Sequence, residues 1–176
     1  MQKLPILALL VLCLLSVYSI SEQDIIFFTV SISSLSLLIL LIIKKSLTTG
    51  LLFLMLLVSI FYLIGHIFNL FGADIEYDGF LHFYWGFTIS YLFGNSIKKI
   101  WSKAFIKQRL ALIFIVILFG ITVSISWEIF ELIVYKFLPE YVIGELTDTI
   151  SDLIFDSLGI LLATILVIFK NNEQKH

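Results

Sequence analysis

The sequence has one cysteine and few charged residues, and both shortages are informative. Cys13 is the only cysteine, so the chain cannot form an internal disulfide, and the apolar neighbours of Cys13 predict a small core residue. Charged residues make up 14% of the 176 residues, whereas hydrophobic residues make up 60% and the mean hydropathy is +1.10. Soluble domains average about 45–50% apolar residues. The composition therefore predicts an integral membrane protein.

Several catalytic signatures are also missing. The chain has no His-Glu-x-x-His zinc-protease helix, no Gly-x-Ser-x-Gly nucleophile elbow and no phosphate-binding P-loop. Ser124 and Ser126 stand near Glu128, but no histidine lies close in sequence to activate either hydroxyl. We therefore interpret both serines as helix-packing residues, which are common between membrane helices.

Long apolar runs are abundant. A membrane-spanning helix needs about 20 predominantly apolar residues, and six segments qualify: 4–20, 25–43, 47–71, 79–97, 110–137 and 149–169. No linker or repeat divides them, so we expect one all-α domain of six transmembrane helices over residues 1–176. The first segment could instead be a signal peptide, because Lys3 precedes it and small residues end it, although Tyr18 and its length fit a retained anchor as well.

The basic residues sort to one side of the six predicted helices. Ten of the eleven fall on that side, five of them in the loop near residues 98–109, and only Lys136 falls on the other. The positive-inside rule then predicts that the N and C termini are cytoplasmic. We expect the protein to lie in the inner (plasma) membrane. The opposite side has no arginine to clamp a phosphate. It carries these acids: Glu22, Asp24, Asp74, Glu76, Asp78, Glu140, Glu145 and Asp148.

Ionisable residues in the last three predicted helices share a height and, within each helix, a face. They are spaced three or four residues apart, which aligns them on one side of a helix. They are Asp78 and His82, then Glu128 and Glu131, then Asp148, Asp152 and Asp156. A rise of about 1.5 Å per residue places all of them in the outer third of a hydrocarbon core about 30 Å thick, or at its rim. Gly86, Ser90 and Gly94 continue one row and predict close helix packing.

Six carboxylates in a weakly hydrated pocket cannot all stay charged and unpaired, and Lys136 is the only lysine or arginine nearby. A divalent cation, protonated carboxylates or open access to water would each resolve this. Mixed oxygen and imidazole ligands suit Zn, Mn, Fe or Mg. His66, alone in its segment, fits a satisfied interior histidine better than a ligand. The expected metal ligands are Asp78, His82, Glu128, Asp152 and Asp156, with Glu131 as general base for metal-bound water.

Three motifs in the same helices resemble those of the YjdF-like inner-membrane proteins. They are Tyr77-Asp78-Gly-Phe-Leu-His82-Phe-Tyr-Trp-Gly86-Phe87, Trp127-Glu128-Ile-Phe-Glu131 and Asp148-x3-Asp152-x3-Asp156-Ser-Leu-Gly159. This resemblance covers the last three helices and implies a multi-span bacterial or archaeal membrane protein, without implying a function. A more distant resemblance is to the VanZ-like proteins, which share the Asp-x3-His helix start and are linked to glycopeptide-antibiotic resistance. Glu131 and Asp152 make this chain more acidic, so that role is not carried over.

The sequence leaves three classes of function open. We favour a metal-dependent membrane protein that acts on a lipid or cell-envelope substrate. A cation- or proton-coupled transporter would use the same acids as an ion pathway, but below His82 and Asp156 the sequence offers mainly serine, threonine and glycine to continue it. A structural or accessory protein would use the acids to hold its helices together. Membrane lipids are expected partners, and nucleic acid is not.

Overall fold

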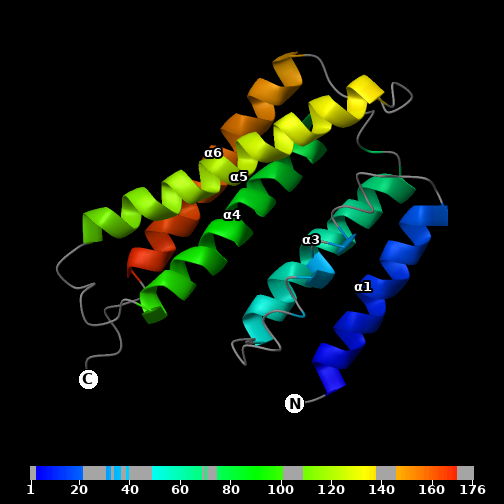
Figure 1. The fold of residues 1–176 in the computed structure, drawn as a ribbon, viewed down its shortest axis with the longest axis horizontal. Helices are drawn as coiled ribbons and strands as arrows, with labels where there is room; N and C mark the ends of the chain where they lie inside the picture. The colour runs from blue at the N-terminus through cyan, green and yellow to red at the C-terminus, as the bar shows by residue number, and fades with distance from the viewer. Residues whose placement is uncertain are drawn as a thin grey trace. The chain divides into compact units, whose positions relative to one another are not determined.

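Helices make up almost all of the described part of the chain. The computed structural model describes residues 3–21, 31–32, 34–36, 39, 49–68, 70, 75–100, 109–137 and 146–169. Its helices are α1 (Lys3–Ser21), α3 (Thr49–Ile67), α4 (Ile75–Ile100), α5 (Arg109–Phe137) and α6 (Leu146–Phe169) (Figure 1). No strand occurs in these ranges, which agrees with the predicted all-α class. The chain forms two compact units, Met1–Leu70 and Phe71–His176.

Two of the described helices are long and apolar enough to cross a membrane. The qualifying stretches are Arg109–Val134 of α5 and Thr147–Phe169 of α6, close to the predicted spans 110–137 and 149–169. A shorter apolar stretch, Leu56–Gly65, lies in α3. The helix α4 covers the predicted span 79–97 but is more polar, because tyrosine, glycine, serine and asparagine interrupt its apolar residues.

In the first unit, α1 and α3 contact each other. On α1 the residues Leu12, Leu15 and Ser16 are buried, and the Ser16 hydroxyl donates a hydrogen bond to the Leu12 carbonyl at 2.8 Å. The prediction that Cys13 is a core residue is wrong, because its side chain is exposed. Positions 12, 15 and 16 recur on one side of a helix of 3.6 residues per turn, and position 13 is turned about 100° away from position 12. An apolar run in a membrane helix thus does not tell its buried side from its outward side.

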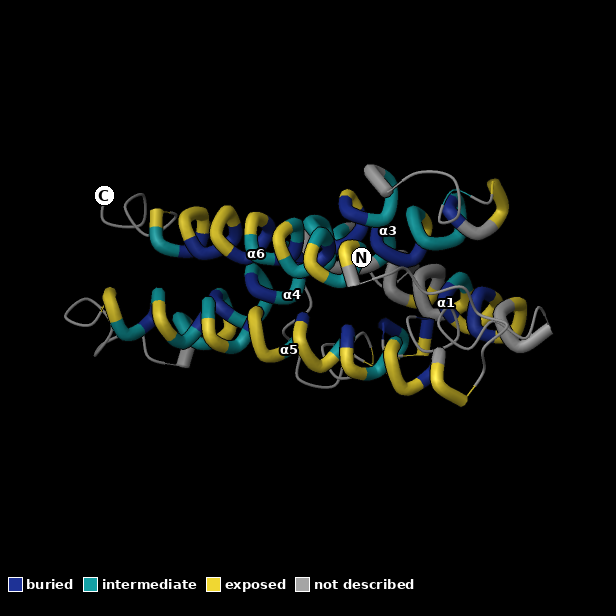
Figure 2. The backbone as a smooth tube through the Cα atoms, turned by 90° about the horizontal axis from the view of Figure 1, so that it is seen from above, coloured by how far each residue is buried: buried dark blue, intermediate teal, exposed yellow. Residues whose placement is uncertain are grey.

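In the second unit, α4 packs against both α5 and α6. Exposed residues run along the outer edges of α5 and α6, with α4 between them (Figure 2). Large apolar side chains such as Phe114, Leu118, Ile154 and Leu158 are half-exposed or more. The exposed hydroxyl of Thr122 donates to its own helix, to the Leu118 carbonyl at 2.7 Å. Outward faces of this kind suit contact with lipid, where polar groups must be satisfied internally.

Glycines bring the backbones of α4 and α6 into contact. A Cβ atom added to Gly86 would lie 2.7 Å from the Asp156 carbonyl oxygen, and one added to Gly159 would overlap the Phe83 carbonyl and lie 2.8 Å from the Phe87 nitrogen. Real Cβ atoms do not approach other atoms this closely, so only glycine fits at either position. The two helices are therefore fixed at a close distance near the middle of the unit.

The half of the second unit below these glycines is tightly packed and mostly apolar. We call it the apolar end. Leu112, Val116 and Val167 are fully buried there, and partly buried side chains including Phe93 and Ile97 pack against them. A Cβ atom on Gly94 would lie 3.0 Å from Val167, and one on Gly120 would lie 2.5 Å from the Ser90 hydroxyl. The row Gly86, Ser90 and Gly94 therefore packs helices together, as the sequence predicts.

Candidate functional site

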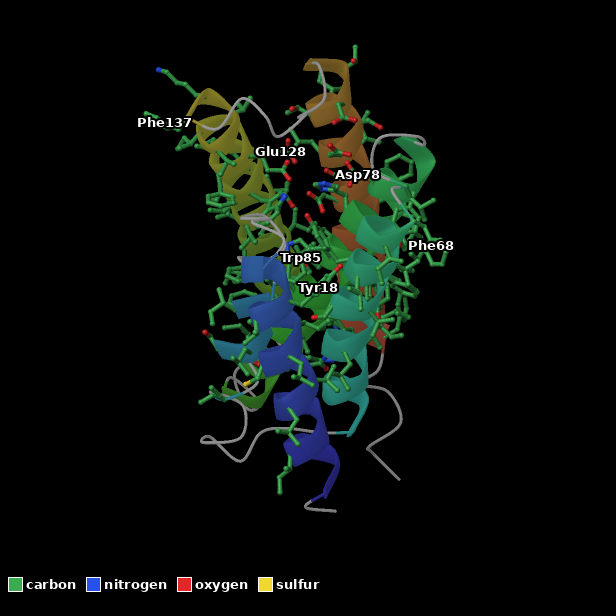
Figure 3. All side chains as sticks on the ribbon, turned by 90° about the vertical axis from the view of Figure 1, so that its right-hand side faces the viewer. Tyr18, Phe68, Asp78, Trp85, Glu128 and Phe137 are labelled. Carbon is green, nitrogen blue, oxygen red and sulfur yellow. The ribbon has the colours of Figure 1, made fainter. Side chains whose placement is uncertain are left out.

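The opposite half of the second unit, the acidic end, contains the ionisable residues singled out in the sequence. It consists of the first half of α4, the second half of α5 and the first half of α6. In Figure 3 the labelled side chains of Asp78 on α4 and Glu128 on α5 lie at this end, among other carboxylate oxygens. Each helix contributes one face, because its polar residues are spaced three or four apart.

His82 is the centre of the acidic end, and carboxylates from two other helices surround its ring. The Nδ1 atom lies 3.3 Å from Asp156 Oδ2, within hydrogen-bonding distance. The same nitrogen lies 3.8 Å from Glu128 Oε1. On the other edge of the ring, Nε2 lies 3.9 Å from Asp152 Oδ2. The predicted convergence of α4, α5 and α6 on one site is therefore present in the structure.

These four side chains are almost completely removed from solvent. The exposed fraction is 7% for His82, 4% for Glu128, 3% for Asp152 and 1% for Asp156. Three of their oxygens, Glu128 Oε1, Asp152 Oδ1 and Asp156 Oδ1, are buried without a hydrogen-bond partner among the described residues. A buried acceptor that lacks a donor costs about 1–3 kcal/mol, and more when it is charged. The acidic end therefore has a deficit of positive charge and of donors.

Two overlapping triads of the described residues have a geometry suited to an ion. Asp78, His82 and Asp152 form one, and His82, Glu128 and Glu131 form the other. In each triad one ligand atom per residue lies within 4.8 Å of the other two. Asp78 and Glu131 are less buried than His82, Glu128 and Asp152, so both triads extend from a buried interior toward the surface of the unit, and we call this less buried edge the rim.

Close helix packing places these side chains. Gly86 lies one turn after His82 on α4 and contacts the backbone of Asp156, so the carboxylate of Asp156 is held next to the imidazole. Near the start of α4, a Cβ atom on Gly79 would overlap the Phe155 ring. The small residues of the motifs thus bring the acids of α6 within reach of α4.

Some predicted features lie elsewhere. Asp148 is half-buried one turn before Asp152 and belongs to neither triad of described residues. Lys136 is exposed in the last turn of α5. The side chain of His66 lies outside the described residues, and α3 belongs to the other unit. Among the described ion pairs of these acids, His82 is the only basic partner.

The structure shows how the two serines near Glu128 are placed, and it brings a threonine into contact with Glu128. Ser124 is buried, as expected for a packing serine. The packing prediction is wrong for Ser126, because its side chain is exposed and donates to the Thr122 carbonyl of its own helix at 2.7 Å. Thr149 on α6, which the sequence reasoning missed, forms a side-chain hydrogen bond with Glu128. Its position three residues before Asp152, on the same helix face, was the available signal.

Known proteins give a family but no activity. The family model described as "Predicted membrane protein (DUF2238)" matches residues 2–173, so it also includes the first three predicted helices, which the motif resemblance does not cover. An "Uncharacterized protein" of Thermotoga maritima is 35% identical over 96 residues, which are 54% of this chain and 49% of that relative. The matched stretch thus spans about half the length of the relative. No solved structure matches the chain. Because the family model extends over nearly the whole sequence, the chain belongs to the DUF2238 family of predicted membrane proteins.

Proposed function

We propose that this protein is a six-span inner-membrane protein whose acidic end binds a divalent metal ion, with N and C termini in the cytoplasm. The sorting of ten of the eleven basic residues supports this orientation and puts the acidic end at the outer leaflet. The similarity of three motifs to the YjdF-like proteins is compatible with the family match. The more distant VanZ-like resemblance contributes nothing to the proposal.

The observation that carries the proposal is the excess of buried acceptors around His82. Glu128, Asp152 and Asp156 approach one imidazole, and one oxygen of each is buried without a described donor. A divalent cation would supply the missing positive charge, and oxygen ligands with one imidazole suit Zn, Mn, Fe or Mg. The pool of ligands is Asp78, His82, Glu128, Asp152 and Asp156.

The proposed chemistry depends on the partly buried rim of the site, where Asp78 and Glu131 lie. An ion held by buried carboxylates with one position open toward the rim would acidify a bound water molecule. Glu131 lies on that rim, with a carboxylate oxygen within 4.8 Å of a His82 nitrogen, and would accept the proton as general base. A lipid or cell-envelope molecule is the substrate class that reaches such a site from the outer leaflet.

Transport is the main competing function, and the apolar end weighs against it. An ion leaving His82 toward the cytoplasm would have to pass the contacts of Gly86 and Gly159, where no Cβ atom fits, and then the buried cluster around Leu112 and Val116. A conduction path needs water or polar ligands in sequence. The acidic end is therefore better suited to binding from one side than to passage through the unit.

Metal analysis and thermal unfolding of the purified protein in mild detergent test the proposal. We expect stoichiometric metal, and stabilisation of about 2.7 kcal/mol when the metal is at a hundredfold excess over its dissociation constant. Asp152→Asn should lose most of that gain, because it removes a buried charge beside His82. The matched charge-neutralising control, Glu22→Gln, lies between the first two predicted spans and should keep it.

The outcomes separate the three classes of function. Absence of metal together with a melting temperature that is indifferent to chelator would reject the metal site. If stability then fell as pH rose, protons shared among the carboxylates would be the neutralising species, which would favour proton-linked transport. Stability indifferent to both chelator and pH would leave the structural reading of the acids.

A further inference from the structure

The two nitrogens of His82 face different carboxylates. The distances differ, so one nitrogen is placed for a hydrogen bond and the other for binding a metal ion. Nδ1 is 3.3 Å from Asp156 Oδ2, a hydrogen-bonding distance, whereas Nε2 is 3.9 Å from Asp152 Oδ2. A separation of 3.9 Å is too long for a hydrogen bond. It is suitable for two ligands of one ion, since each would lie about 2.0–2.2 Å from the metal.

The carboxylates near the two nitrogens of His82 also lie at different depths in the unit. Asp156 lies one turn further along α6 than Asp152 and is the most buried of the acids, at 1% exposed. Its backbone and its Oδ1 atom lie close to Gly86, at a position where an added Cβ atom would not fit. Asp78 lies one turn before His82, toward the start of α4, and is half-buried. The Nδ1 edge of the ring therefore faces the interior, and the Nε2 edge faces the rim.

A neutral imidazole has one N–H group and one lone pair, so only one nitrogen can bind a metal. If Nδ1–H donates to Asp156, the lone pair is on Nε2, which lies 3.9 Å from Asp152, a member of the triad with Asp78. The alternative triad with Glu128 and Glu131 would use Nδ1, which lies 3.8 Å from Glu128. That arrangement leaves Asp156 without the hydrogen bond that the structure gives it. A neutral His82 that keeps its hydrogen bond to Asp156 therefore favours the triad with Asp78 and Asp152.

We propose that the ion is bound by His82 Nε2, Asp78 and Asp152, and that Asp156 is a positioning residue that holds Nδ1–H rather than a ligand. This inference rests on the proposed metal site and narrows its pool of ligands. A carboxylate on the second nitrogen fixes the tautomer and the orientation of a metal-bound histidine.

The test is magnetic resonance of the full-length protein in mild detergent, loaded with a spin-active cadmium isotope and carrying nitrogen-labelled histidine. The chain has three histidines, and His82→Gln identifies the signal of His82. We expect coupling between cadmium and Nε2 of His82, with a protonated Nδ1. Coupling to Nδ1 would overturn the assignment while leaving the metal site itself intact. Failure of the parent protein to bind any of zinc, manganese, iron, magnesium and cadmium would reject the proposed function, and this inference with it.

Two variants make the role of Asp156 measurable. Asp156→Asn keeps an oxygen acceptor for Nδ1–H, so we expect metal affinity to fall about 10–100-fold while the cadmium–Nε2 coupling persists. Asp152→Asn replaces a charged carboxylate ligand by a neutral amide, so its loss of affinity should be greater. If Asp156→Asn abolishes binding as completely as Asp152→Asn, Asp156 is a ligand and the inference fails. If Asp156→Asn does not fold, the spectrum of the parent protein decides between the two nitrogens.

Discussion

The two ends of the α4–α5–α6 unit are built from the same three helices and differ in the kind of side chain that they bury. At the acidic end, buried carboxylates crowd one imidazole, and three of their oxygens lack a described donor. At the apolar end, Leu112, Val116 and Val167 are fully buried and glycines bring the helices together. The comparison teaches that apolar packing and the polar groups of the proposed site are separated along the helix axes. A substitution at one end should therefore affect either stability or metal binding and spare the other.

The largest effect is expected at the apolar end. Leu112→Ala removes a fully buried side chain and should lower the free energy of unfolding by about 2–5 kcal/mol through lost contacts and a cavity. Metal affinity per folded molecule should stay unchanged. Thermal unfolding and metal titration in detergent measure the two quantities. The matched control is Leu110→Ala on the same helix, where the side chain is 72% exposed and the change in stability should be small. A loss of metal affinity in Leu112→Ala would break the separation of the two ends.

A smaller effect is expected where α5 meets both other helices. A Cβ atom on Gly120 would lie 2.5 Å from the Ser90 hydroxyl and 2.8 Å from Ile160, so Gly120→Ala should force the helices apart. Alanine also favours a helix over glycine, so we expect a net loss of about 1–2 kcal/mol. Ser90→Ala removes the hydroxyl and should restore part of this loss in the double variant. Strictly additive effects in this cycle would argue against direct contact between positions 90 and 120.

The smallest effect is expected on the outward face of α5. Ser126→Ala removes a hydroxyl that is bonded to its own helix and exposed, so stability should change by less than about 0.5 kcal/mol. Metal affinity and any hydrolytic activity should be unchanged. A clear loss of activity with unaltered stability would reopen Ser126 as a nucleophile. Ser124→Ala, at the buried serine of the same pair, is the comparison for a packing role.

Helical periodicity and a common height were sufficient to predict the meeting of α4, α5 and α6 at His82. The spacing of Asp152 and Asp156 fixes their helix face, and distance along the helix fixes their depth. Periodicity could not predict which nitrogen of His82 each acid approaches, because that depends on ring rotation and on the contact at Gly86.

Other features depend on packing that leaves no periodic signal. The outward position of Cys13 could not be predicted from its apolar neighbours, since lipid and protein interiors favour the same residues. The bond between Thr149 and Glu128 joins two helices, so the spacing within α6 indicates the face of Thr149 but not its partner. The six spans and their orientation rest on the loop charges and stay predictions.

The contact of Gly159 with α4 has a consequence for helix register. Asp148, Asp152 and Asp156 repeat every four residues, or about 6 Å along the axis, so a slide of α6 by one turn would offer His82 a chemically equivalent acid. Such a slide would replace Gly159 at the Phe83 carbonyl by a residue four positions away, and on one side that residue is Phe155. No ring fits where a single Cβ atom already overlaps. Three acids repeat at equivalent positions along α6, and Gly159 alone allows the register in which His82 contacts Asp152 and Asp156.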